Sequence, residues 1–464
     1  MRKHQSSLEL DQQRQQQSEN PNRIFSNRQL KEMIVPLLLE QFLLMLVGLS
    51  DTFIVSYAGE AAVSGVSLVN SFNTVFLYLF TALASGGCVV VSQYIGSGEK
   101  EAASKAVSQL LMVSTVFSIL ITAVVLIFNQ KLILAVFGKV EPDVREACIT
   151  YLRISAYSYP ALAVYNAGAA LYRSVGKTKT TMYISFAANG INVVGNVIGV
   201  FVLKAGVAGV AYPSLISRTF SAIVITVLCF RESMEIHYRK DFIFQWNGKL
   251  LGQILSIAVP NGVESGIFQF VKVALSSVVA LFGTYQIAAN GIAQSFWSVA
   301  ALISVSMGPV FITVIGQCMG AGDIPQAEYY FRKLLKVTLM LSLVWNALIF
   351  AVTPFILRFY AVSAETRRLV IWLVLIHNIS NSLIFPFADP FGKGLRAAGD
   401  VRFTMGVSLF TTIGVRLVFS LLLGLVLDLG VVGIALAMCL DWLIRAIIFW
   451  MRYRSGKWKA YRVI

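Results

Sequence analysis

Two carboxylates stand inside an apolar stretch near the start of the chain, and they are its most obvious candidates for chemistry. Residues 33 to 57 read MIVPLLLEQFLLMLVGLSDTFIVSY, with Pro36, Glu40 and Asp51 inside the run. The two acids are 11 residues apart, or about three helical turns, and therefore lie on one side of a helix. A carboxylate in hydrocarbon costs at least ~2.5–3.5 kcal/mol, which makes it a site hypothesis by default. The chemistry would be cation exchange, because a coupling ion and a cationic substrate cannot both neutralise one buried charge.

The same design returns 224 residues later. Residues 257 to 282 read IAVPNGVESGIFQFVKVALSSVVALF, with Pro260 and Glu264 at the positions equivalent to those of the first stretch. Lys272 follows Glu264 by eight residues on roughly the same helix face. It belongs either to the site or to a structural ion pair with Glu264.

The elements that position these residues are membrane-spanning helices. The chain has 464 residues, of which 57% are hydrophobic and 13% charged, unlike a soluble globular protein. Runs of about 20 apolar residues, enough to cross ~30 Å of hydrocarbon as a helix, recur along it and are too long for barrel strands. We predict an all-α polytopic membrane protein with twelve transmembrane helices, at roughly 33–57, 62–91, 105–128, 147–171, 180–203, 207–230, 250–275, 285–315, 333–353, 366–391, 403–427 and 430–451.

The net charge of +15 reflects topology rather than nucleic-acid binding. The two tails and the loops after even-numbered helices hold 25 Lys and Arg residues, whereas loops after odd-numbered helices hold 7. The positive-inside rule then places both termini in the cytoplasm, with anionic lipid of the inner leaflet as partner. We expect a multi-pass protein of the inner (plasma) membrane, without a cleavable signal peptide. The five cysteines show no metal-ligand spacing and are interpreted as packing residues.

The chain is a duplication. Equivalent residues recur at offsets of 223 or 224, among them Gln93 with Gln317, Gly96 with Gly320, and Arg173 with Arg396. Each repeat has six helices, an even number, so the repeats run in parallel about an axis normal to the membrane. The predicted parts are a disordered cytoplasmic tail (1–28), an N-lobe (29–230), a cytoplasmic linker (231–249), a C-lobe (250–452) and a cytoplasmic tail (453–464).

Two six-helix repeats, the placement of their carboxylates, the GSGE and GAGD turns, and the LYRSVGKTKTT and LRAAGDVRFT turns together resemble the multidrug and toxic compound extrusion (MATE) family. The resemblance covers about residues 30 to 460. It implies a secondary antiporter that expels organic cations and other amphiphiles in exchange for Na⁺ or H⁺ by alternating access of two lobes. The sequence is closer to the NorM-type branch than to the DinF-type branch, because Asn196 stands where the latter has an aspartate.

The resemblance also implies site residues. Asp51 matches the family's helix 1 aspartate, Asn192 its N-lobe asparagine, and Glu264 its helix 7 glutamate. The helix 10 aspartate of NorM-type members has no equivalent here, and Asp389 is the nearest carboxylate. A Na⁺ site is expected either at Asp51, Asn192 and Asn196 or at Glu264 and Asp389.

Several of these residues also have a purely structural interpretation. Asn192 and Asn196, four residues apart, either line the site or join helices by amide hydrogen bonds. Glu40 either lines a polar cavity or is solvated near the cytoplasmic end. Asp389 lies between two prolines, which predicts a broken helix with free carbonyls that could ligate a cation.

The remaining interior polar residues carry weaker expectations. Asn381 joins the candidate site from the same helix as Asp389, whereas His377 is interpreted as a packed or hydrogen-bonded histidine. Asp441, Arg218 and Arg416 are expected to form structural pairs or to reach the interface. Phe72, Phe268, Phe296 and Trp297 are aromatic candidates for a pocket that takes planar cations.

An enzyme is not expected, because the chain has no HExxH, GxSxG, Walker or complete GxGxxG motif. We expect a monomer without a cofactor, driven by an ion gradient and handling small organic cations or amphiphiles. A flippase for a lipid-linked precursor is the alternative, and it would need several basic residues in the central cavity. The deep groups of this sequence are interpreted as mainly acidic. A channel or scaffold would not depend on the carboxylates.

Overall fold

The computed structural model describes residues 23–138, 141–360 and 362–464, which form helices joined by short loops. The first half contains, in order, α2 (Asn27–Ser56), α3 (Glu60–Gly96), α4 (Lys100–Phe137), α5 (Pro142–Tyr157), α6 (Tyr159–Ser174), α7 (Thr178–Val197), the π-helical η1 (Ile198–Val202) and α8 (Ala208–Cys229). The short helix α9 (Lys240–Ile243) lies in the predicted linker.

The second half repeats this order with more interruptions. It contains α10 (Gly248–Val279), η2 (Ala280–Phe282), α11 (Thr284–Ala300), α12 (Leu302–Gly320), α13 (Ile324–Ile356), η3 (Leu357–Phe359), α14 (Ala364–Leu383), α15 (Phe385–Ala388), α16 (Pro390–Ala397), α17 (Val401–Phe410), η4 (Thr411–Leu417), α18 (Val418–Leu421), η5 (Leu422–Val426), α19 (Gly430–Arg454) and η6 (Lys457–Ala460).

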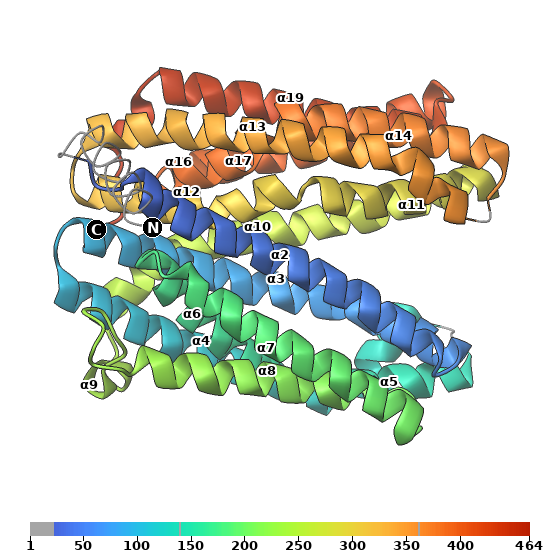
Figure 1. Ribbon diagram of the computed structural model, residues 1–464, viewed down its shortest axis with the longest axis horizontal. Coiled ribbons are helices and arrows are strands. Elements are labelled where there is room, and N and C mark those ends of the chain that lie inside the picture. The colour runs from blue at the N-terminus through green and yellow to red at the C-terminus, as the bar shows by residue number, and fades with distance from the viewer. Residues whose placement is uncertain (1–22, 139–140, 361) are drawn as a thin grey trace, which may run out of the picture.

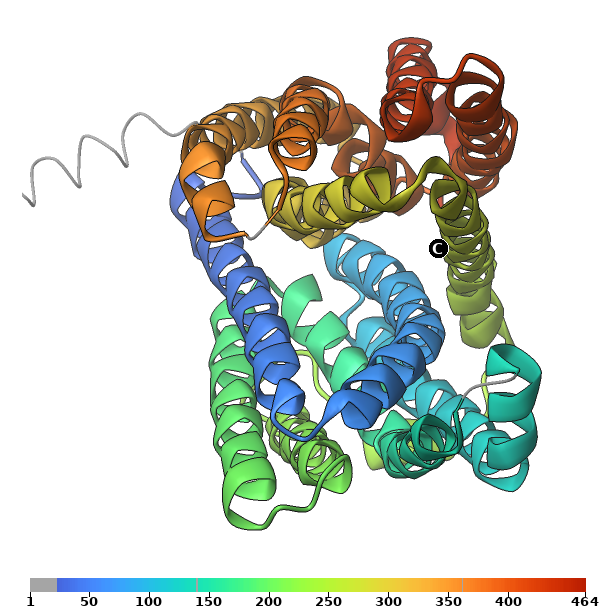
Figure 2. The same ribbon diagram turned by 90° about the vertical axis from the view of Figure 1, so that its right-hand side faces the viewer.

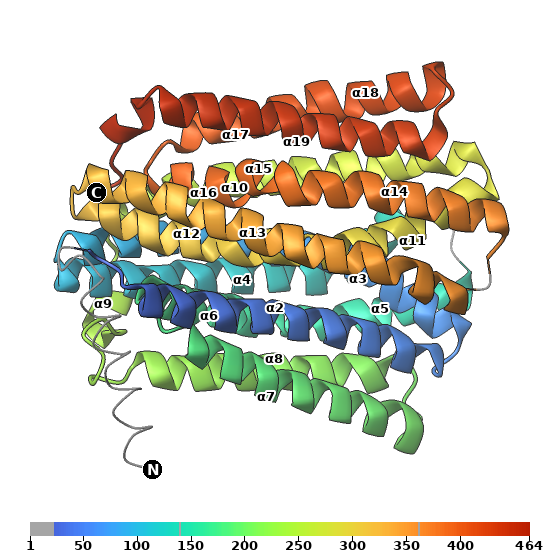
Figure 3. The same ribbon diagram turned by 45° about the horizontal axis from the view of Figure 1, so that its top comes forward.

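The helices run side by side along the long axis of the molecule and form two bundles. In Figure 1 the bundle of α2 to α8, blue to green, lies below the bundle of α10 to α19, yellow to red. The view along the helices in Figure 2 shows the same separation. Figure 3 shows α9 and the C-terminus at one end of the bundles. The predicted all-helical, two-repeat architecture is thereby confirmed.

The membrane spans agree with the predicted segments. In the described part of the chain, ten helices are long and apolar enough to cross a membrane, and the bent pair Ala364–Leu383 and Phe385–Ala397 makes an eleventh. The predicted segment 147–171 is formed by α5 and α6, which are separated at Ser158. Each of these two helices has 16 residues, so neither is long enough to be counted as a span by itself. Twelve predicted spans are consistent with this arrangement.

The predicted break beside Asp389 is confirmed. The helix α15 ends at Ala388 and α16 begins at Pro390. The sharp bend of this span, 55°, lies one turn earlier, between Ala364–Leu383 and Phe385–Ala397. A proline has no backbone N–H, and its ring clashes with the carbonyl group one turn earlier. The prolines of this span therefore leave backbone carbonyl groups without their helical hydrogen bonds inside the C-lobe.

The lobes share a core at one end only. One hydrophobic cluster contains residues of both lobes, including Leu110 of α4 and Leu334 of α13, which are fully buried. At the opposite ends of the helices each lobe has its own cluster, one within residues 54–211 and one within residues 271–435. The lobes are therefore joined at the end that carries α9 and the C-terminus, and have separate cores at the other.

The joint is a crossing of α3 and α12 at two equivalent glycines. A Cβ atom at Gly96 would collide with the backbone carbonyl of Gln317, and one at Gly320 with that of Gln93. Because these residues pair at the offset of the sequence repeat, the contact is pseudo-symmetric. Only glycine permits backbones this close.

Hydrogen bonds reinforce the crossing. Gln93 Nε2 donates to the carbonyl of Ala397 at 2.8 Å, and Gln317 Nε2 donates to that of Ser174 at 2.7 Å. The backbone N–H of Val463 donates to Gln93 Oε1 at 3.1 Å. The C-terminal segment thus packs on the joint between the lobes.

We expect Gly320→Ala to push the lobes apart at this joint, because overpacking a close contact costs about 1–3 kcal/mol. The readout is the rate at which maleimide labels Cys318, which is fully buried beside the crossing. Labelling should become faster in Gly320→Ala and stay unchanged in the control Gly252→Ala, whose added Cβ would meet no atom within 4 Å. Equal rates in the two variants would contradict the proposed role of the crossing.

The N-terminal tail differs in part from the expectation. Residues 1–22 of the predicted disordered tail lie outside the described residues. Residues 23–28 are ordered, because Phe25 is buried against Tyr330 of α13, with ring centroids 5.8 Å apart. The backbone N–H of Phe25 also donates to Tyr330 Oη at 2.9 Å. Together with Ile24, whose N–H donates to Gln326 Oε1 at 2.7 Å, Phe25 holds this segment on the C-lobe.

Candidate functional site

Asp51 is a residue of α2 in the N-lobe, and its side chain contacts α7. Asn196 Nδ2 donates to Asp51 Oδ1 at 2.6 Å and to Asn192 Oδ1 at 3.2 Å. Asp51 makes no ion pair with any described residue, and Arg218 of α8 donates instead to Ser158 at 2.7 Å. Asp51 is thus a half-buried carboxylate held by an amide; Arg218 acts on its charge from a distance but does not contact it.

The amides around Asp51 leave hydrogen-bonding capacity unused. Asn192 Nδ2 donates to Ser214 Oγ of α8 at 3.0 Å. The Oδ1 atom of Asn196, a residue with no exposed surface, is without a hydrogen-bond partner, and so is Nδ2 of Asn189, one turn before Asn192. An anionic oxygen next to one unsatisfied amide oxygen, that of Asn196, is the beginning of an oxygen ligand set that suits a hard cation such as Na⁺. The structure therefore brings together the three N-lobe residues that the sequence singled out, and adds Ser214.

Glu40 has a different environment. Its side chain is buried and accepts from Arg173 Nη2 at 3.2 Å, Thr181 Oγ1 at 3.1 Å and Ser185 Oγ at 3.2 Å. The interpretation that Glu40 is solvated at the cytoplasmic end is therefore wrong. Three donors fix this carboxylate as a cross-link between α2, α6 and α7.

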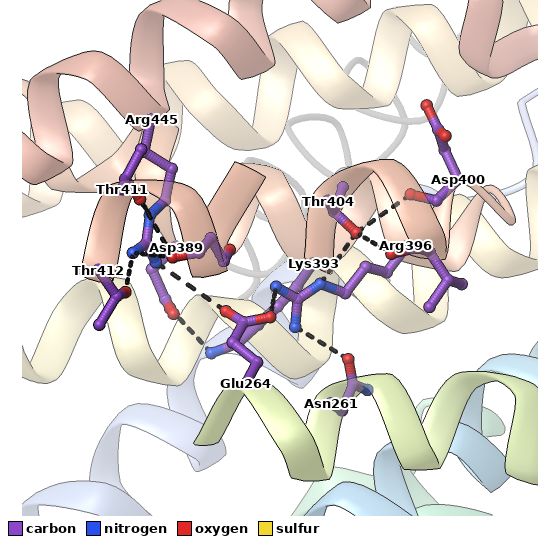
Figure 4. A network of polar contacts seen from close by, with 12 residues as sticks. Asn261, Glu264, Asp389, Lys393, Arg396, Asp400, Thr404, Thr411, Thr412 and Arg445 are labelled. Carbon is purple, nitrogen blue, oxygen red and sulfur yellow. Dashed lines mark hydrogen bonds and ion pairs between the residues drawn. The ribbon is translucent and has the colours of Figure 1, made fainter. Parts of the chain in front are cut away.

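Glu264 is the C-lobe counterpart of Glu40. It pairs with Arg396, and its Oε1 lies 3.9 Å from Arg445 Nη1 (Figure 4). Arg396 also donates to Asn261 Oδ1 at 2.9 Å and to Thr404 Oγ1 at 3.3 Å. Lys272 is not the partner of Glu264. The carboxylate is bound by two guanidinium groups instead.

The two glutamate–arginine pairs are equivalent under the repeat. The offset between Glu40 and Glu264 is 224, and the offset between Arg173 and Arg396 is 223. Arginine recognises carboxylates through a fixed fork of donors, and in each lobe this links the first helix to the end of the fourth. The repeated arginines were visible in the sequence, but their partnership with the glutamates was not.

The second predicted Na⁺ site lacks a free carboxylate. Asp389 Oδ2 is paired with Lys393 Nζ at 2.8 Å, one turn along the same helix. Figure 4 shows Lys393 between Asp389 and Glu264. Among the described residues, no group of three or more His, Cys, Asp or Glu could hold a metal ion. A cation at Glu264 and Asp389 would have to compete with basic side chains, so the N-lobe site fits Na⁺ better.

Asp441 is paired as predicted. Its Oδ2 lies 2.8 Å from Arg416 Nη2, and its Oδ1 accepts from Arg445 Nη2 at 3.0 Å. With these arginines and Lys393, the C-lobe interior is at least as basic as it is acidic. The expectation that the deep groups are mainly acidic is wrong, because sequence position alone did not reveal which arginines lie inside.

The other candidates are scattered. Asn381 and His377 are both buried on α14, and none of their side-chain polar atoms has a hydrogen-bond partner. Lys272 is exposed and makes no ion pair with a described residue. Of the aromatic candidates, Phe268 lies under the guanidinium of Arg416, at 4.9 Å. An internal cation already occupies that ring face.

The fold and these charges define a class of protein. Twelve predicted spans in two parallel repeats, joined at one end and carrying a half-buried carboxylate without an ion pair inside one lobe, are the architecture of a secondary membrane transporter.

Comparison with known proteins gives the family. The model of the MatE family matches residues 36–198 and again 260–422, two matches separated by the offset of the sequence repeat. The chain belongs to the MATE family, whose members are membrane transporters rather than enzymes.

Individual relatives are distant but cover nearly all of the chain. The chain is 24% identical to an uncharacterized transporter, YisQ, of Bacillus subtilis, over 91% of this chain and 93% of the relative. It is 22% identical to the probable multidrug resistance protein NorM of Thermotoga maritima, over 94% of both chains. Its fold matches a multidrug resistance MATE family transporter solved in an outward-facing conformation, with a TM-score of 0.85, 20% identity, and coverage of 93% of this chain and 96% of that one.

Proposed function

We propose that the protein is a secondary antiporter that exports small amphiphilic or cationic compounds in exchange for Na⁺ or H⁺. The observation that carries this proposal is Asp51, an interior carboxylate that is held by an amide and forms no ion pair with a basic side chain of the described residues. Such a charge in a membrane is costly, and a cation lowers that cost by binding. A relative named as a probable multidrug resistance protein supports the export of drugs and toxic metabolites.

The arrangement of the lobes supports alternating access. They share a core at one end and have separate cores at the other, as in one extreme of a rocking cycle. With both termini in the cytoplasm, as the distribution of basic residues indicates, this state faces outward across the inner (plasma) membrane. Coupling follows if a Na⁺ ion or a proton displaces the cationic cargo from Asp51 in this state. We propose that a monomer suffices, because each chain contains both lobes.

The flippase alternative has no specific support. It requires a cluster of basic residues able to hold a diphosphate, and arginines do lie in the C-lobe. However, Arg396, Arg416 and Arg445 are largely neutralised by Glu264 and Asp441. The surplus is a single positive charge, too small for a diphosphate group.

The test is transport by the purified wild-type protein in liposomes. A Na⁺ gradient and a pH gradient are imposed separately, and the movement of ethidium is followed by fluorescence, with protein-free liposomes as control. We expect ethidium to move against the flow of one of the two ions, and to stop when that gradient is collapsed by an ionophore. If ethidium moves at the same rate with a Na⁺ gradient, with a pH gradient and with neither, the proposal is overturned.

A further inference from the structure

The interior of the C-lobe carries more positive than negative charge. Three guanidinium groups, those of Arg396, Arg416 and Arg445, share two carboxylates, those of Glu264 and Asp441. Arg445 lies between the two acids, 3.9 Å from Glu264 and 3.0 Å from Asp441. All five side chains are largely buried, where an unbalanced charge is costly. The nearby pair of Asp389 and Lys393 is neutral and does not change the balance (Figure 4).

Arg416 is the least satisfied of the three arginines. It is 5% exposed, and its Nε and Nη2 atoms make no hydrogen bond, although Nη2 is 2.8 Å from Asp441 Oδ2. The ion pair therefore has the distance of a hydrogen bond without its orientation. Buried donors on a charged group without acceptors are costly. An acceptor that reached the guanidinium, at Nε above all, would remove this cost.

Other unsatisfied polar groups lie on the elements packed near Arg416. Trp442 lies beneath its guanidinium at 5.8 Å and is stacked on Trp297 at 6.1 Å. The indole Nε1 of Trp297 is buried without an acceptor. The charge of Arg416 also acts on His377, which is 2% exposed, and neither ring nitrogen of His377 has a partner. Asn381 lies one turn further along α14 with both amide atoms unpaired.

The aromatic faces of this region are not free for a cationic cargo. The guanidinium of Arg416 lies over the rings of both Phe268 and Trp442. A planar cation would have to share these faces with a buried positive charge and would be repelled. Lys272, exposed one turn after Phe268 and without an ion pair among the described residues, adds a second positive charge nearby. The electrostatics of the C-lobe therefore select against cations.

We propose that this cluster binds an anionic group, such as the carboxylate of an aromatic cargo, against Arg416. Trp297 donates a hydrogen bond to the anion, and His377 and Asn381 supply further polar contacts. The inference rests on the proposed export function and refines it: the cargo is a zwitterion or an aromatic acid, with its carboxylate in the C-lobe and any cationic group at Asp51. A carboxylate or an inorganic anion such as chloride would satisfy the same guanidinium.

The test is calorimetric titration of the whole protein in nanodiscs, which needs no ion gradient and so is independent of coupling. The probes are 2-naphthoate, its neutral isostere 2-naphthamide, and chloride. Because about 1.4 kcal/mol corresponds to tenfold in affinity, losing the Arg416 charge in Arg416→Gln should weaken naphthoate binding at least ~10-fold. Naphthamide, which carries no charge, should bind more weakly than naphthoate and equally to both proteins.

A second variant covers the case in which Arg416→Gln does not fold. Lys272→Gln alters an exposed side chain and should weaken naphthoate binding by about threefold through lost long-range attraction, with Lys272→Arg restoring it. Naphthoate binding that 100 mM chloride does not displace assigns the site to an organic carboxylate. Displacement, with chloride binding that depends on Arg416, assigns it to inorganic anions. Naphthamide binding as tight as that of naphthoate, or anion binding equal in wild type and both charge-removing variants, would overturn the proposal.

Discussion

Asp51→Asn is expected to abolish ion-coupled export while leaving the protein folded. Asparagine has the size of aspartate, and its Oδ1 can still accept from Asn196 Nδ2, so the contact between α2 and α7 survives. The negative charge does not survive. Removing one member of a buried charge pair costs about 2–5 kcal/mol, so affinity for a cation should fall at least ~30-fold.

The measurement is gradient-driven ethidium movement in liposomes that contain equal amounts of folded protein. The matched control is Asp241→Asn, the same chemical change at an exposed position of α9, which should transport like the wild type. If Asp51→Asn transports at the rate of Asp241→Asn, Asp51 does not couple ion and cargo.

The largest effect on stability is expected for Glu40. Glu40→Gln leaves Arg173 without its carboxylate, and Arg173→Met leaves Glu40 buried without a cation; breaking a buried pair from one side costs about 3–5 kcal/mol. The double variant removes both charges, so it should lose less stability than the sum of the single variants. This non-additivity identifies a structural cross-link.

Stability is measured by thermal unfolding in detergent, with all four proteins of the double-mutant cycle. Glu60→Gln, at an exposed first-turn position of α3, is the control and should change the free energy of unfolding by less than about 0.5 kcal/mol. If the losses of stability are strictly additive, or if Glu40→Gln is as stable as the wild type, Glu40 and Arg173 do not form a structural cross-link. Glu40 would then again be a candidate coupling residue.

The contrast between Asp51 and Glu40 shows what the sequence could predict. Apolar runs, the 224-residue repeat and the break beside Asp389 follow from hydropathy and from proline, which act locally, and the structure confirms each. That acids lie inside the lobes also follows. Whether an interior acid is paired depends on how its helix is rotated against neighbours more than 100 residues away, and Arg173 is 133 residues from Glu40.

Two further features depend on packing in three dimensions. Residues 23–28 are held by contacts with α13 of the other lobe, such as Phe25 on Tyr330, which no local sequence pattern encodes. The sequence suggested Phe268 as part of a pocket for planar cations. The guanidinium of Arg416 lies over this ring, so the region is positively charged instead. Repeat symmetry could have indicated the two glutamate–arginine pairs, because Glu40 and Arg173 both recur at the repeat offset, as Glu264 and Arg396.

The difference between the lobes gives them different roles in the proposed cycle. The N-lobe holds a carboxylate without an ion pair beside the unsatisfied amide oxygen of Asn196. The C-lobe holds carboxylates paired with arginines, with one positive charge in excess. Coupling by Glu264 stays a prediction, but a cation there would have to displace Arg396. In the proposed cycle, ion and cargo therefore compete first at Asp51.

The most direct test of this exchange is equilibrium binding of ethidium to the purified protein, titrated at several Na⁺ concentrations and pH values. If one negative charge is neutralised in turn by ion and cargo, the apparent Kd for ethidium rises in proportion to Na⁺ or to H⁺ activity in the wild type, and this dependence disappears in Asp51→Asn. An affinity indifferent to both ions, or a dependence that persists unchanged in Asp51→Asn, would contradict the account.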